Sequence, residues 1–208
     1  MRSLVVVLAA CGPMYAQPGG SPPPSADPVA APATAPVPAS APAPAAAPVP
    51  ASGPAPAAAP AAAAGTIAQR FVAAHNRARA THCARPLTWS TKLAGAAQKW
   101  ADTLKAKGCV FGHSGGAYGE NLAAGTEGVL DPEATVAMWY DEIKHYKFPD
   151  GGFSMQTGHF TQLVWRATTQ VGCGHAQCKG NDIWVCEYDP PGNYDGEYRQ
   201  NVLPAGCK

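Results

Sequence analysis

The chain has 208 residues, enough for one domain or two small ones, and its formal net charge is only +1. Charged residues make up 14% of the sequence and no basic run occurs, so the composition carries no electrostatic signature of nucleic-acid binding. No run after residue 16 approaches the roughly 20 apolar residues that a membrane-spanning helix needs. For the residues after position 16, we therefore expect neither nucleic-acid binding nor a membrane-spanning helix.

Residues 1–16 have features of an export signal. Arg2 supplies a positive start and residues 4–8 an apolar run, although that run is short for a secretory signal. Leu8-Ala9-Ala10-Cys11 resembles the bacterial lipobox, whose cysteine is lipidated and becomes the first mature residue; a truncated or misassigned start is the alternative. Without Cys11, six of the seven cysteines remain, an even number that suits an oxidising compartment. We therefore expect an extracellular or cell-envelope protein that meets the membrane only through a lipid on Cys11.

Residues 17–64 consist almost entirely of Pro, Ala, Ser and Gly. Such a segment cannot bury enough apolar surface to offset the entropy cost of ordering it. Its repeated Ala-Pro steps favour an extended spacer, about 3.1 Å per residue at full stretch. We expect a disordered linker, with no specific motif for cargo binding, that holds a domain away from a surface.

A folded domain is predicted from residue 66 to residue 208, because the composition changes abruptly there and enough residues remain for one core. Thr66 is a suitable N-cap for a first helix ending near Thr81, and Ser90 for a second helix that stops at Gly108. Pro132 at a first-turn position opens a third. The expected inward-facing residues are Ile67, Phe71, Ala74 and Ala78, then Leu93, Ala97, Trp100, Ala101 and Leu104, then Val136, Trp139, Tyr140 and Ile143.

Two strands are predicted over residues 171–177 and 183–188, and the short connection between them favours a hairpin. Residues 190–193, Pro-Pro-Gly-Asn, then break regular structure. Helices combined with an antiparallel hairpin, without repeated βαβ units, indicate the α+β class.

The stretch 158–166 places a histidine beside a dense apolar patch. Phe160, Leu163 and Val164 have helical spacing, while Phe160, Gln162 and Val164 also fit strand alternation, so both structures stay open. In either, His159 lies at the start of a buried element, where an imidazole is easily positioned. A histidine at the edge of the core is the simpler interpretation.

Two sequence patterns are typical of serine hydrolases, but the predicted structure around them does not fit that class of enzyme. Residues 112–116 match the G-x-S-x-G elbow, but no helix is expected after Ser114. His82, Asp102 and Ser114 have the trypsin-like order, yet they are too close in sequence, and Asp102 falls inside the second helix. A serine hydrolase is not expected.

A zinc finger and a cysteine nucleophile are disfavoured for one shared reason. The ligand types for zinc are present, but the paired C-x2-C spacing is absent. Thiols of an exported chain oxidise, and a disulfide-bonded cysteine cannot act as a nucleophile. The residues concerned are Cys173, Cys178 and Cys186, with His175 nearby.

A histidine and carboxylate set remains. His113 and Glu120 span a Gly-rich turn that lets the two side chains fold back towards one point. Glu142 lies at the margin of the third helix's buried stripe, and His159 opens the stretch described above. Two imidazoles can hold a divalent ion while carboxylates orient the rings or the ion's waters. A buried ionic network that only fixes packing is the alternative.

Several stretches of the domain share a resemblance to one family. They are His75-Asn76 with Arg79, Pro86-Leu87-Thr88-Trp89, His113-Ser114 followed by Tyr118-Gly119-Glu120-Asn121-Leu122, Trp139-Tyr140-Asp141-Glu142, Gly158-His159-Phe160-Thr161-Gln162-Leu163-Val164-Trp165, and Tyr188-Asp189-Pro190-Pro191-Gly192-Asn193-Tyr194. In this order they resemble the CAP superfamily, or SCP domain, of cysteine-rich secretory proteins, antigen 5 and plant pathogenesis-related proteins. The match covers residues 66–208 and is most similar to plant and microbial secreted members.

The resemblance implies a three-layer α-β-α sandwich with a central antiparallel sheet and a shallow cleft. The family tetrad of that cleft falls on His113, Glu120, Glu142 and His159. In the family the two histidines can bind Zn²⁺ or another divalent ion, and no common catalytic reaction is agreed. Cysteine matching implies Cys109–Cys173 and Cys178–Cys186, which leaves Cys83–Cys207, where plant members carry a different third pair.

Three functions follow as hypotheses. The first is a non-enzymatic, surface-displayed binder of a sterol, a fatty acid or a protein partner, with a ligand loop of Tyr146, Phe148, Phe153 and Met155. The second is a metal-dependent, peptidase-like hydrolase with Glu120 or Glu142 as base. The third is an adhesin or toxin-like effector that needs only the rigid fold. A loop that packs on its own apolar residues is the alternative for the first.

Overall fold

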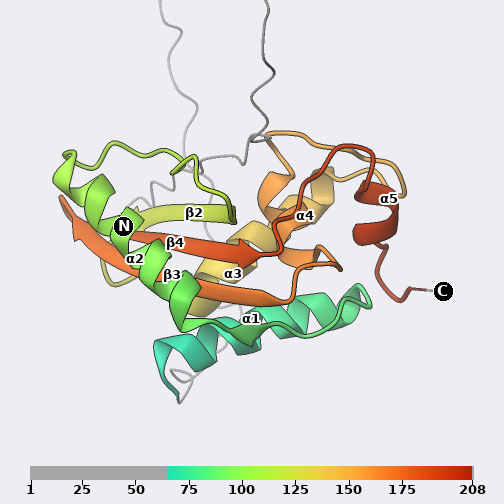
Figure 1. The fold of residues 1–208 in the computed structure, drawn as a ribbon, viewed down its shortest axis with the longest axis horizontal. Coiled ribbons are helices and arrows are strands. Elements are labelled where there is room, and N and C mark those ends of the chain that lie inside the picture. Colours follow the sequence, from blue (N-terminus) through green and yellow to red (C-terminus); the bar gives the residue numbers. More distant parts are fainter. Residues whose placement is uncertain (1–64, 208) are drawn as a thin grey trace, which may run out of the picture. The chain divides into compact units, whose positions relative to one another are not determined.

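The computed structural model describes residues 65–207 of the chain, shown in colour in Figure 1. The predicted signal segment 1–16, the lipidation site Cys11 and the linker 17–64 lie outside the described residues, so these remain predictions. Within 65–207, none of the helices combines the length and apolar character needed to cross a bilayer.

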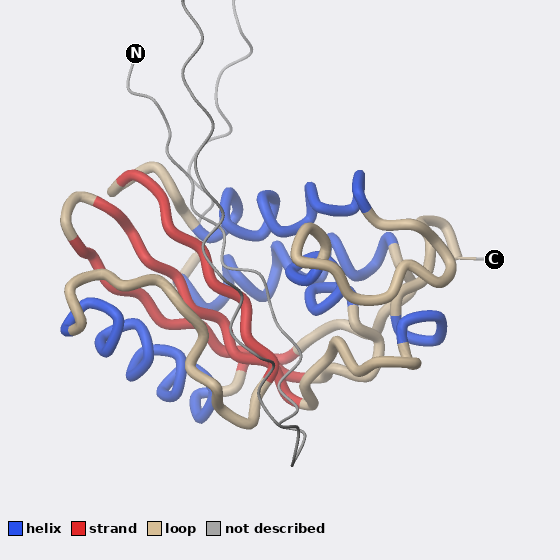
Figure 2. The backbone as a smooth tube through the Cα atoms, turned by 90° about the horizontal axis from the view of Figure 1, so that it is seen from above, coloured by secondary structure: helices blue, strands red, loops and turns tan. Residues whose placement is uncertain are grey.

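The described residues form helices on both faces of one sheet. The elements are α1 (Ile67–Thr81), β1 (Thr88–Trp89), α2 (Thr91–Ala106), β2 (Gly119–Thr126), α3 (Pro132–Asp141), the 3-10 helix η1 (Glu142–His145), α4 (Gly158–Val164), β3 (Gln170–Cys178), β4 (Asn181–Asp189) and α5 (Tyr198–Asn201). α2 covers one face, and α1, α3 and α4 lie on the other (Figures 1 and 2). The predicted α+β class and sandwich arrangement are confirmed.

The three long helices begin at the predicted positions. Thr66 Oγ1 accepts the backbone N–H of Gln69 at 3.2 Å, and Gln69 returns a side-chain oxygen to the Thr66 N–H at 2.8 Å, which completes a capping box. Ser90 caps α2, and Asp131 caps α3 ahead of Pro132 at its first position. The ambiguous stretch at residue 158 is the helix α4.

The sheet has the strand order β1-β3-β4-β2. β4 pairs antiparallel with both β3 and β2, as the predicted hairpin requires, whereas β1 pairs parallel with β3. The expected all-antiparallel sheet is therefore a mixed sheet with one short parallel edge strand. β2 was not predicted, because its sequence of small and polar residues, Gly-Glu-Asn-Leu-Ala-Ala-Gly-Thr, lacks the usual β-branched and aromatic content.

The sheet separates two cores because strand side chains alternate between its faces. On the α2 face, Leu122, Ile183 and Val185 pack against α2. On the opposite face, Trp184 and Tyr188 join the larger core with α1, α3 and α4. A Cβ at position 172 or 174 would overlap the α2 backbone, so the two glycines of β3 allow α2 to lie directly on the sheet.

The fully buried guanidinium of Arg79 connects α1 to the end of α4 by hydrogen bonds. Its Nε donates to the Arg85 carbonyl at 2.8 Å, and Nη1 donates to the carbonyls of Leu163 and Trp165 at 3.0 and 2.9 Å. Nη2 donates to the Thr168 carbonyl at 2.9 Å. Burial lowers the pKa of Arg79 to about 10, so the group stays charged at neutral pH. One side chain thus donates to four backbone carbonyls, of which that of Trp165 also accepts the Thr168 N–H.

The disulfides correct two of the three implied pairings. Cys83–Cys207 forms as expected, but the other bonds are Cys173–Cys186 and Cys109–Cys178 instead of Cys109–Cys173 and Cys178–Cys186. Cys173 and Cys186 face each other across the β3–β4 ladder with their Cα atoms 4.1 Å apart. Cys178 belongs to the α2 face, so it meets the cysteine that follows α2 rather than Cys186 on the opposite face.

Candidate functional site

His113 and Glu120, predicted as a pair, are in direct contact. His113 Nδ1 lies 2.6 Å from Glu120 Oε1, and the backbone N–H of Ser114 donates to the same carboxylate at 3.0 Å. Trp100 Nε1 donates to the Gly112 carbonyl at 3.0 Å and so anchors the preceding loop on α2. Because an ionised carboxylate only accepts hydrogen bonds, Nδ1 of the neutral ring carries the proton and Nε2 keeps a lone pair.

His159 and Glu142 form the second pair in the same manner. Nδ1 of His159 lies 2.6 Å from Glu142 Oε1, while Oε2 accepts the backbone N–H groups of His159 and Phe160 at 2.9 and 3.1 Å. The His159 ring stacks on Trp139 with the planes 11° apart. The carboxylate therefore fixes both the rotation of the ring and its tautomer.

The remaining nitrogen of His159 is the most informative atom of the site. The residue is fully buried, and its Nε2 has no hydrogen-bond partner among the described residues. Leaving a buried polar atom unsatisfied costs about 1–3 kcal/mol. A lone pair held at this cost in a fixed direction is suited to a cation.

The two pairs flank the start of β2, which is an edge strand of the sheet. Glu120 lies on the face of β2 that Leu122 shares with α2, whereas Asn121 lies on the other face and donates to the His159 carbonyl at 3.1 Å. No group of three or more His, Cys, Asp or Glu side chains within residues 65–207 surrounds a common metal position. An ion bound here would have at most two imidazoles as such ligands.

Glu187 is a site residue that sequence reasoning missed. It lies opposite Glu120 in the β2–β4 register, and both residues are almost fully buried. Burial, followed by the charge and hydrogen bond of Glu120, raises the pKa of Glu187 well above its usual range, so the pair holds one proton at neutral pH. The available signal was a carboxylate directly after the apolar run 183–186, on the same face of the strand as Ile183 and Val185.

The predicted ligand loop is mostly part of the core. Tyr146 is buried and packs edge-to-face on Phe148, with 4.8 Å between ring centroids. Phe148 and Phe153 are half-buried against the same cluster. Met155, by contrast, is 64% exposed. The four side chains therefore do not share one open surface.

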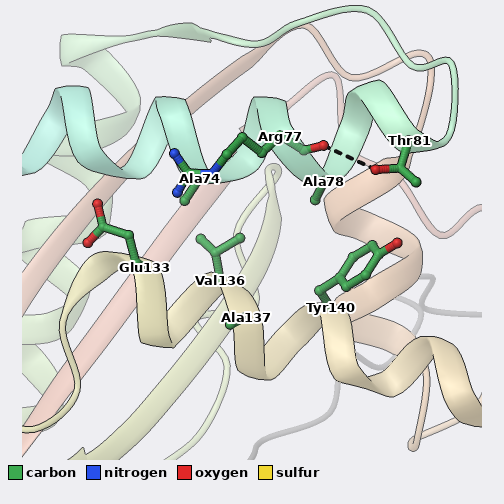
Figure 3. A pocket seen from close by; sticks show the side chains of 8 residues that line it. All are labelled: Ala74, Arg77, Ala78, Thr81, Glu133, Val136, Ala137 and Tyr140. Carbon is green, nitrogen blue, oxygen red and sulfur yellow. Dashed lines mark hydrogen bonds between the residues drawn. The ribbon is translucent and has the colours of Figure 1, made fainter. Parts of the chain in front are cut away.

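A groove that the sequence did not reveal, with an apolar floor and polar residues along it, lies between α1 and α3 (Figure 3). Its volume is about 280 Å³. Ala74 and Ala78 on α1 face Val136 on α3, and Arg77 and Glu133 project at one end of the groove (Figure 3). The remaining lining residues are Thr81, Ala137 and Tyr140. The predicted core positions Ala74 and Val136 are indeed buried, and the groove lies over them because a sequence pattern does not show how closely two helices approach.

The residues of the disfavoured alternatives are dispersed or occupied. Buried His82 contacts the Leu203 carbonyl and the Tyr140 hydroxyl, while exposed Asp102 accepts from Gln98 on α2. Ser114 contacts neither, so no serine triad forms. Cys173, Cys178 and Cys186 are all in disulfides, and His175 pairs with Asp182 at 2.8 Å, so no zinc finger forms among them.

Known proteins are similar to this chain in sequence and in fold. The model of the cysteine-rich secretory protein family matches residues 72–188, more than half of the chain. PRY2 of Saccharomyces cerevisiae is 46% identical over 138 residues, which cover 64% of this chain and 40% of PRY2. Pathogenesis-related protein 1A of Nicotiana tabacum is 43% identical over 132 residues, 62% of this chain and 78% of that protein.

The crystal structure of NaASP2 with Zn²⁺ superposes with a TM-score of 0.54 and 24% identity, covering 69% of this chain and 88% of that one. At this identity the likeness concerns the fold alone. The family match and the fold agree, and this chain belongs to the cysteine-rich secretory protein (CAP) family.

Proposed function

We propose that this chain is a secreted, non-enzymatic binding protein whose site at the start of β2 takes an exchangeable divalent cation, Zn²⁺ foremost, through Nε2 of His113 and His159. The unpartnered, buried Nε2 of His159 carries the proposal. When bound, the ion would supply positive charge and open coordination positions for a ligand. NaASP2, which has a similar fold, was solved with Zn²⁺.

The carboxylates favour a binding role over hydrolysis. Both oxygens of Glu142 accept hydrogen bonds from the His159 ring and two backbone amides. Glu120 serves the His113 ring, the Ser114 amide and Glu187. A general base needs a carboxylate that can reach a water and take its proton, and both candidate bases are engaged in orienting the rings.

The family description and three disulfides support an extracellular or cell-envelope location. Attachment through a lipid on Cys11 stays a prediction from the sequence. An oxidising compartment would keep these bridges intact.

Replacing both ligands should abolish metal binding. We expect the His113→Ala, His159→Ala double variant to lose the single Zn²⁺ that the wild-type chain retains in equilibrium dialysis. His175→Ala, at the far end of β3, is the matched control and should bind normally. Wild-type affinity should fall from pH 8 to pH 5 because only the neutral ring coordinates a metal. Undiminished zinc uptake by the double variant would rule out this site.

The α1–α3 groove favours a second, independent ligand, a fatty acid. Its volume of about 280 Å³ is just below the usual range of small-molecule sites, and alanine and valine side chains line it together with four more polar residues. Arg77 at its end, for which no ion pair is formed among the described residues, offers a positive charge for a carboxylate head group (Figure 3). Glu133, at the same end as Arg77, is already paired with Arg70. A flexible alkyl chain suits this narrow groove better than a rigid sterol.

Filling the groove should block this ligand. Ala78→Trp places an indole in the space between α1 and α3, and we expect fatty-acid affinity to fall at least about tenfold, equivalent to about 1.4 kcal/mol. Ala106→Trp, at the exposed end of α2, is the control. The affinity of each variant for a fatty acid, and separately for a sterol, is measured by titration. Equal fatty-acid affinity in Ala78→Trp and Ala106→Trp would contradict the assignment of the groove.

A further inference from the structure

A pocket beside η1 gathers soft donor atoms. Of the four methionines in the chain, Met138 and Met155 lie in the described residues, and both line one pocket of about 290 Å³. His145 lines it with them. The three residues come from α3, from η1 and from the loop before α4, so segments separate in sequence converge on this space.

Packing does not account for this arrangement. Met155 is 64% exposed, so its side chain gains little from burial, and Met138 is only half-buried against the core. The His145 side chain is exposed and makes no hydrogen bond or ion pair with any other residue of the range 65–207. Two thioethers and an imidazole are therefore accessible around one hollow.

The other groups around the pocket select against hard cations. The carboxylate of Asp141 is paired with Lys144, and that of Glu142 is occupied by His159 and backbone amides. No uncommitted carboxylate then remains to bind Mg²⁺ or Ca²⁺. Thioether sulfur prefers Cu(I), whereas imidazole accepts several transition metals, so the combination favours a soft monovalent ion.

We propose that Met138, His145 and Met155 form a binding site for Cu(I) that uses none of the ligands of the zinc site, although Glu142 of the second histidine–glutamate pair lines the same pocket. Two thioethers and a neutral imidazole carry no negative charge. They therefore suit a monovalent ion better than a divalent ion, which is usually bound by at least one anionic ligand. The pocket opens to solvent at Met155, which gives the ion a route of entry and exit. Binding involves coordination alone, without any change of oxidation state.

The test uses Ag(I), which has the same charge and donor preference and is stable in air. The full-length chain carries Cys11→Ser in every arm, so that a free thiol does not compete. Methyl labelling of all four methionines gives an internal control, since Met1 and Met14 report non-specific thioether binding. We expect the resonances of Met138 and Met155 to shift together up to one equivalent of Ag(I), before those of Met1 and Met14.

Variants assign the donors. Met138→Leu with Met155→Leu keeps side-chain volume and should weaken Ag(I) binding at least about tenfold, and His145→Gln should also weaken it. The His113→Ala, His159→Ala variant should bind Ag(I) as the wild type does. Parallel shifts of all four methionines, unchanged binding by the leucine variant, or loss only in the His113/His159 variant would each overturn the proposal.

Discussion

Glu187→Gln should make the protein more stable than wild type at alkaline pH. Glu187 and Glu120 are buried opposite each other, and burial together with the Glu120 charge raises the pKa of Glu187 well above its usual range. The folded state thus holds a proton that the unfolded state releases near pH 4–5. That contribution is present at low pH and is lost as pH rises through the folded-state pKa.

Glutamine keeps a hydrogen-bond donor towards Glu120 but cannot ionise. The wild-type free energy of unfolding should therefore fall between pH 7 and pH 9.5, while that of Glu187→Gln should change less. Each pKa unit of perturbation corresponds to about 1.4 kcal/mol, so a difference of about 2 kcal/mol or more is expected at the alkaline end. Urea unfolding across this range measures it.

Glu127→Gln is the matched control for this experiment, because Glu127 is exposed and should leave the pH dependence as it is in wild type. Parallel stability curves for wild type and Glu187→Gln would show that the two carboxyl groups do not share a proton.

Arg79→Lys should cost about 3 kcal/mol or more of stability, because several buried carbonyls lose their hydrogen-bond donor. The guanidinium serves four carbonyls through three nitrogens, and an ammonium at a single point cannot reach all of them. Each buried carbonyl left unpaired costs about 1–3 kcal/mol. Because small domains have only about 5–15 kcal/mol of stability, this loss is a large share of the total.

Arg77→Lys provides the comparison, since Arg77 lies two residues earlier on the same helix and is exposed. Its unfolding free energy should stay within about 0.5 kcal/mol of wild type. If the urea midpoints of both variants differed from wild type by a similar amount, the hydrogen bonds of the buried Arg79 guanidinium would not contribute more to stability than an exposed arginine does.

The sequence predicted local structure well where the signal is local. Thr66, Ser90 and Pro132 mark helix starts because caps act within one turn, and the β3–β4 hairpin follows from a short connection. β2 escaped prediction, since pairing with β4 rather than its own composition determines it.

Properties that depend on which face a strand presents could not be predicted with the same success. Counting cysteines gave the number of bridges, but the partners follow from the register, which places Cys173 opposite Cys186 and directs Cys178 towards α2. Glu187 belongs to the site for the same reason. Its role depends on the residue across the ladder, Glu120, which is 67 positions away in sequence.

The most direct measurement of the central proposal is the imidazole nitrogen spectrum of the ¹⁵N-labelled chain during Zn²⁺ titration. The sequence has six histidines, so four serve as internal controls. One equivalent of Zn²⁺ should shift Nε2 of His113 and His159 to metal-bound values while Nδ1 of both rings stays protonated. Zinc binding that leaves His159 Nε2 unchanged, or that displaces either Nδ1 proton, would contradict the proposal.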